Sequence, residues 1–171
     1  MSEPYQLAAL QPDGLPARDA VARVHRLLED WSIQVAEDSL LVLHDTADQE
    51  PEVEPVSDAD QALRRIVEWP ALGTLDYGGP EGMVTVSYLG GSASIGLQGV
   101  LISAQERSVD RTNSVSRYQR LGAALHEELP ARRTVMRWGL EMHGFRWQDE
   151  LERLGRGDIV GSYPLLDLRR I

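Results

Sequence analysis

Residues 73–91, GTLDYGGPEGMVTVSYLGG, predict two antiparallel strands joined by a turn at GGPEG. In the second of these strands, Val84, Val86 and Tyr88 alternate with small polar residues, which is typical of a strand with one buried face. A third strand is predicted at 94–109, and its apolar segment GVLI indicates a position in the middle of the sheet, where both faces are covered. These three strands predict a sheet as the base of the fold.

The rest of the chain alternates between strand and helix patterns. Further strands are predicted at 5–10, 32–45, 133–142 and 158–169. Helices are predicted from Pro16, from Ser57, after 113–116 and over 144–155. Pro164 indicates that the last strand lies at an edge or contains a bulge. Hairpins mixed with helices favour one α+β domain over residues 1–171, with a largely antiparallel sheet and about four helices packed on it.

The composition excludes several kinds of chemistry. Of the 171 residues none is cysteine, which excludes disulfides, thiolate catalysis and Cys-ligated zinc. Lysine is also absent, so all 17 basic residues are arginine and Schiff-base catalysis is excluded. The first residues do not have the pattern of a secretory signal, and no stretch of about 18 apolar residues occurs. We therefore expect a cytoplasmic protein with no membrane partner.

The charge is unevenly distributed along the chain. The formal net charge is −10, and residues 1–91 contain 17 acidic residues but only 5 arginines. Between Arg26 and Arg64 there are 11 acidic residues and no arginine. A field of this sign repels nucleic acids and attracts basic molecules. We therefore expect a basic protein partner and no nucleic-acid partner.

The acidic charge is concentrated in residues 44–60, HDTADQEPEVEPVSDAD, which we expect to be a surface loop because two prolines interrupt it. Its last two acids lie at the start of the predicted helix from Ser57, where they stabilise the helix dipole. The other five have no such structural role; they are Asp45, Asp48, Glu50, Glu52 and Glu54. In an extended chain the three glutamates would share one side. They form either a solvated loop or a docking surface for a basic partner.

No catalytic or cofactor-binding motif is found. His44 with Asp45 and Asp48 does not have a known metal-ligand spacing, and His126 lacks the second histidine of a zinc-protease helix. The glycine clusters lack the strand–loop–helix context of a phosphate loop. We therefore expect a binding protein without metal or cofactor, and not an enzyme.

The acidic stretch 44–60 and the passage ALRRIVEWPALGTLDYGGPEGMVTVSYLG (62–90) resemble bacterial immunity proteins of polymorphic-toxin and type VI secretion systems. The resemblance implies a single-purpose inhibitor that occludes the active site of one cognate toxin, often a nuclease with a basic cleft. The carboxylates of 45–54 would replace substrate phosphates. Trp69 and Tyr77 would be exposed aromatic anchors, since binding hot spots favour Trp and Tyr.

Two alternatives remain open. The first is a small enzyme or ligand-binding domain with a pocket near His44 and Asp45, or near Glu141 and His143. Titratable groups that converge in a cleft would favour it, whereas a broad acidic surface without a deep polar pocket favours an inhibitor. The second is an acidic subunit of a phage or secretion assembly, which would expose a large apolar patch.

Overall fold

The computed structural model describes residues 4–36, 38–46, 48–80, 82–90, 96–104 and 111–170. For residues 111–114 the description is limited to the backbone. In this part of the chain, no helix combines the length and the apolar character needed to cross a membrane.

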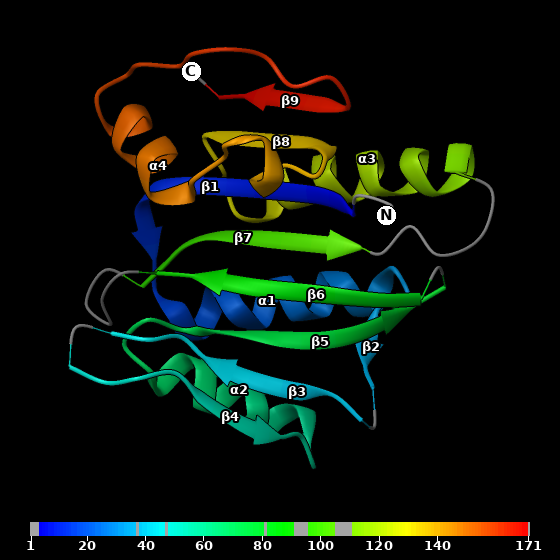
Figure 1. Cartoon of the computed structure of the whole chain (residues 1–171), viewed down its shortest axis with the longest axis vertical. Helices are drawn as coiled ribbons and strands as arrows, with labels where there is room; N and C mark the ends of the chain where they lie inside the picture. The colour runs from blue at the N-terminus through cyan, green and yellow to red at the C-terminus, as the bar shows by residue number, and fades with distance from the viewer. Residues whose placement is uncertain are drawn as a thin grey trace.

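The described strands form one antiparallel sheet (Figure 1). They are β1 (Tyr5–Leu15), β2 (Gln34–Val35), β3 (Leu40–Leu43), β4 (Glu52–Pro55), β5 (Gly73–Gly79), β6 (Gly82–Leu89), β7 (Leu97–Ala104), β8 (Arg133–Trp138) and β9 (Leu166–Arg169). The order is β4-β3-β5-β6-β7-β1-β8-β9, and β2 pairs with β5 beside β3. The predicted hairpin is β5–β6, strand β7 is central, and β9 is an edge strand. The α+β class and the antiparallel sheet are therefore confirmed.

Helices lie on both faces of the sheet (Figure 1). They are α1 (Ala17–Asp30), α2 (Ala59–Glu68), α3 (Arg111–Glu128) and α4 (Trp147–Gly155), with a short 3₁₀ helix, η1 (Glu141–His143). In Figure 1, α1 and α2 lie behind the sheet and α4 lies in front of it. The helix predicted from Ser57 begins two residues later, at Ala59, and Asp58 caps it, because Asp58 Oδ1 accepts the hydrogen bond from the backbone N–H of Asp60.

Two apolar cores follow from this arrangement. In the larger core, the buried sides of α1, α2 and α3 pack against one face of β5, β6 and β7. Leu75, Val86 and Ile102 lie on this face of the three strands. The smaller core packs α4 against the opposite face of β1, β7 and β8. Burial of these side chains is the main stabilising contribution to the fold, at roughly 25 cal/mol for each Å² of apolar surface removed from water.

The region 32–60 differs from the sequence prediction. The predicted strand 32–45 is two strands, β2 and β3, because the chain turns at Ser39, whose Oγ accepts from Ala36 N (3.0 Å) and donates to Asp76 O (2.6 Å). The predicted loop 44–60 contains β4, an edge strand paired with β3. A strand at an edge tolerates a terminal proline such as Pro55, because half of its backbone groups need no partner.

The α4 side of the sheet is only partly covered. On β5 and β6 this side carries Thr74, Asp76, Thr85 and Ser87, all intermediate in exposure. Small polar side chains are expected on a sheet face that contacts water. The boundary between this open area and α4 is where the candidate site lies.

A buried arginine ties the C-terminal segment to the sheet. Arg133 of β8 is 1% exposed, and its guanidinium donates to both carboxylate oxygens of Asp167 at 3.2 and 3.0 Å. It also donates to the carbonyl oxygens of Val160 and Gly161, and it lies 3.5 Å from Glu150 of α4. One side chain therefore links β8, β9, α4 and the connection between them.

Three partly or fully buried histidines should make the stability of the folded protein depend on pH. Burial is the main cause that lowers the pKa of His25, His44 and His126 below 6.5. The unfolded chain therefore binds more protons as the pH falls through about 6.5, and the folded state loses relative stability. The urea midpoint should fall when the pH is lowered from about 7.5 to about 5.5, and a His126→Gln variant should show a shallower decline. An unchanged midpoint over this range would contradict the expectation.

Candidate functional site

A cleft of about 520 Å³ opens between α4 and the β3–β4 connection. One wall is formed by residues 44–46 and 70–71, and the other by Glu141, Trp147 and Gln148. Ser87, Leu89, Gly90 and Leu101 of the sheet complete the lining. The volume is within the range of about 300–1,000 Å³ that is usual for ligand sites. The two sequence regions named as alternative pockets, His44 with Asp45 and the segment of Glu141, thus meet in one cleft.

His44 is fixed by hydrogen bonds on both ring nitrogens. Nδ1 lies 3.0 Å from Ala71 O, which can only accept, so this nitrogen carries the proton. Nε2 lies 2.8 Å from Thr74 Oγ1. Burial lowers the His44 pKa, although the bond to Ala71 and the charge of Asp45 raise it in part. The neutral ring therefore accepts from Thr74, whose Oγ1 lies 2.9 Å from Ser87 Oγ.

Because both ring nitrogens of His44 form hydrogen bonds, neither is free to bind a metal. Within the described residues, no group of three His, Asp or Glu side chains is arranged to hold a metal ion. His143 lies in η1 and is exposed, and it is not among the residues that line the cleft.

Hydrogen bonds hold the described residues next to Asp45 and Asp48. The backbone of His44 is held on both sides, since its N–H donates to Leu72 O (3.0 Å) and its carbonyl accepts from Trp69 Nε1 (2.6 Å). Thr46 Oγ1 accepts from the backbone N–H of Asp48 (3.3 Å) and of Gln49 (3.0 Å). The Thr46 hydroxyl thus satisfies these two backbone donors.

Asp45, Asp48 and Glu50 are exposed, and within the described part of the chain none of them forms an ion pair. Asp45 lines the cleft, and Asp48 and Glu50 follow it along the same connection. Their charges are therefore available to a ligand.

Glu52 and Glu54 differ from these three acids. Both pair with Arg65 of α2, at 3.3 Å from Glu52 and 2.6 Å from Glu54. The hydrogen bond from Arg65 lowers the pKa of Glu54. The interpretation that these glutamates lack a structural role is wrong. In the β3–β4 pairing they lie opposite Leu43 and Leu41, and their side chains are directed toward α2.

Trp69 and Tyr77 are not exposed anchors, so this prediction is wrong. Trp69 is 8% exposed at the end of α2, where its indole donates to His44 O. Tyr77 is 1% exposed, and its hydroxyl lies 2.7 Å from that of Tyr88 and 2.9 Å from His25 Nδ1. Tyr77 shares the buried face of β5 with Leu75, which is the face that α1 and α2 cover.

Glu141 is held by Gln6, which the sequence analysis did not identify. Gln6 of β1 is 6% exposed; its Nε2 donates to Glu141 Oε1 (3.0 Å) and its Oε1 accepts from Glu141 N (2.8 Å). Trp147, half-buried at the start of α4, packs against the smaller core and lines the cleft. No local pattern indicates the contact between Gln6 and Glu141, because the two lie 135 residues apart in the sequence, whereas the apolar spacing of the helix predicted at 144–155 does indicate an inward Trp147.

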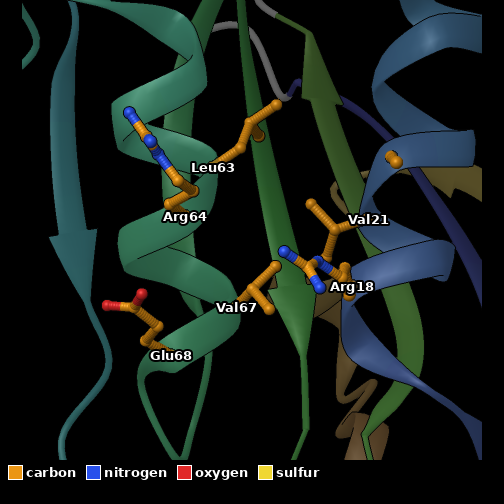
Figure 2. Close-up of a pocket in the computed structure, with 7 residues that line it drawn as sticks. Arg18, Val21, Leu63, Arg64, Val67 and Glu68 are labelled. Carbon is orange, nitrogen blue, oxygen red and sulfur yellow. The ribbon is translucent and has the colours of Figure 1, made fainter.

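A second cavity of about 350 Å³ lies between α1 and α2 (Figure 2). In Figure 2, Val21, Leu63 and Val67 face one another across the groove, and Arg18 extends over it. This groove is mostly apolar, and its charged lining residues are two arginines and one glutamate, Arg18, Arg64 and Glu68, which do not form an acidic site for a cationic group. It is therefore the weaker candidate.

Comparison with known proteins found no family model, no curated protein and no solved structure that matches this chain.

Proposed function

We propose that this protein is an acidic protein-binding module that inhibits a basic protein by occluding its active site. The single observation that carries the proposal is the cleft bordered by Asp45 and Glu141 and continued by the exposed acids Asp48 and Glu50. Among the described residues that line the cleft none is arginine, and the only basic side chain is His44, which is neutral at pH 7.

The charge distribution supports a cationic partner. The net charge of −10 attracts a basic surface over distances set by the ionic strength. Close to contact, the carboxylates of Asp45, Asp48 and Glu50, which form no ion pair with another described residue, can accept hydrogen bonds from Arg or Lys. Glu52 and Glu54 contribute less, because both pair with Arg65, which offsets one of their two negative charges.

The inhibitor proposal follows the resemblance to bacterial immunity proteins. A nuclease toxin has a basic cleft that binds phosphates, and exposed carboxylates can occupy such a cleft in place of the phosphates. In this proposal Asp45, Asp48 and Glu50 provide the carboxylates, and the adjacent sheet face provides additional contact area.

The test compares two triple variants with the same change in charge. Asp45→Asn/Asp48→Asn/Glu50→Gln removes the proposed binding acids. Asp13→Asn/Asp30→Asn/Glu128→Gln removes three other exposed acids outside the cleft. The partner is captured from a lysate of the source organism with the tagged native chain, purified, and assayed for activity with each variant.

The first variant should associate about tenfold or more slowly at low salt and lose inhibition, while the control should behave like the native chain. High salt should reduce the difference, because screening shortens the range of the charges. Equal binding by the two variants, or no basic partner that the native chain inhibits, would refute the proposal.

A small-ligand site is the second candidate function. The observation that favours it is the convergence of His44, Asp45 and Glu141 on one cleft. The distinguishing result would be a small cationic metabolite that raises the melting temperature of the native chain but not of an Asp45→Asn/Glu141→Gln variant, without any protein partner.

A further inference from the structure

The cleft combines three features that together favour one kind of ligand group. Two carboxylates border it, Asp45 and Glu141. An indole, Trp147, forms part of the same wall as Glu141. No arginine lines it among the described residues, although arginine supplies every formal positive side-chain charge of the protein.

The polar groups of the cleft are positioned before any ligand binds. Gln6 holds both the side chain and the backbone N–H of Glu141, so one carboxylate oxygen is occupied, and no described residue is found hydrogen-bonded to the other. Asp45 follows His44, whose ring and backbone together make four hydrogen bonds. Positions fixed in this way reduce the entropy that is lost on binding.

Trp147 is also restricted, because it packs against the smaller core around α4. An aromatic ring attracts a cation placed over its face, and a guanidinium also stacks on it as a flat group. A planar guanidinium can in addition donate two parallel hydrogen bonds to a carboxylate, which an ammonium cannot do.

We propose that this cleft is an anchor pocket for a single guanidinium group, provided by an arginine side chain of the basic partner. The inference rests on the proposed function, since it names the group by which the partner is recognised. The guanidinium contacts Trp147 and the carboxylates of Asp45 and Glu141, and the exposed acids Asp48 and Glu50 contact the basic surface around it.

The proposal is tested without the partner, by ¹H–¹⁵N NMR titration with Nα-acetyl-arginine amide. Nα-acetyl-citrulline amide has nearly the same shape without the charge, and Nα-acetyl-lysine amide has the charge without the planar group. The indole N–H of Trp147 is assigned as the signal that is absent in Trp147→Leu, a substitution that keeps most of the apolar packing against the smaller core.

We expect the arginine probe to shift the Trp147 indole signal and the amide signals of Asp45, Leu89 and Gly90. The citrulline probe should have no effect, and the lysine probe should bind more weakly. Glu141→Gln and Trp147→Leu should each weaken binding of the arginine probe about tenfold, while Asp158→Asn, an exposed acid away from the cleft, should not. A thermal unfolding curve for each variant confirms that it is folded.

Absence of shifts, equal binding of the citrulline probe, or shifts confined to residues outside the cleft would overturn the proposal. Failure of the proposed function is a separate result. If the partner binds and Glu141→Gln and Trp147→Leu do not weaken it, the anchor pocket is refuted and the inhibitor function stands. If the arginine probe binds in the cleft but no basic protein is inhibited, the pocket stands as a site for a small guanidinium ligand and the inhibitor function is refuted.

Discussion

Replacing Arg133 with alanine should lower the free energy of unfolding by about 3–5 kcal/mol, because it removes the buried counter-charge of Asp167 and Glu150 and leaves the more exposed Arg169 and Arg153 to pair with them. Asp167 and Glu150 would lose their buried partner, and two carbonyl oxygens, Val160 O and Gly161 O, would lose a donor. The guanidinium also lies 5.1 Å above the ring of Tyr163, and that contact would be lost as well. Urea unfolding at neutral pH measures the change.

Arg153→Ala is the matched control for this variant. Arg153 also pairs with Glu150, at 3.3 Å, but its side chain is 43% exposed, so its removal should cost less than about 1 kcal/mol. Because both arginines pair with Glu150, the difference between the two losses in the free energy of unfolding measures the effect of burying the charge. A loss for Arg133→Ala no larger than that for Arg153→Ala would show that the C-terminal segment is not held by this residue.

The ionisation of Asp167 makes the stabilising contribution of the Arg133 network depend on pH in the acid range. Burial alone would raise its pKa, but hydrogen bonds from Arg133 and Arg169 outweigh this effect and lower the pKa below 3.8. The folded carboxylate therefore stays ionised at a pH at which the unfolded one is protonated. The stabilising contribution is complete above the unfolded pKa and is lost as the pH falls through the folded pKa.

The sequence predicted the parts of the fold that local periodicity determines. The β5–β6 hairpin, the central strand β7 and the helices α1 to α4 each contain a repeated apolar pattern that only one kind of element satisfies. The short strands β2 and β4 were not predicted, because two to four residues are too few to show a period. Their conformation is determined by pairing with β5 and β3.

The candidate site was predicted in part. Asp45, Asp48 and Glu50 are exposed as expected from their position between polar residues and proline. The pairing of Glu54 with Arg65 could not be predicted, because it depends on α2 folding back over β4. The cleft itself joins segments from 44 to 148, and no single stretch of sequence contains its geometry.

Replacing Tyr77 with alanine should also lower the free energy of unfolding by about 3–5 kcal/mol, because it opens a cavity in the larger core. The hydroxyl of Tyr77 connects two other polar groups, the Tyr88 hydroxyl and His25 Nδ1. His25 Nε2 lies 3.4 Å from a carboxylate oxygen of Glu29, which favours a proton on Nε2 and leaves Nδ1 to accept from Tyr77. Tyr88 is fully buried, and its hydroxyl would lose its hydrogen bond to Tyr77, the partner found for it among the described residues.

Tyr77→Phe separates the two contributions. It keeps the ring and removes only the hydroxyl, so the expected loss is about 1–3 kcal/mol, the cost of leaving buried polar groups without a hydrogen bond. The pair of variants also distinguishes a core role from a binding role. If Tyr77 is a core residue, the urea midpoint is lowest for Tyr77→Ala, higher for Tyr77→Phe and highest for the native chain. The folded Tyr77→Phe variant then binds the partner with unchanged affinity. A partner anchor would give the opposite result, a native midpoint with weakened binding, and would require Tyr77 to leave the sheet face that α1 and α2 cover.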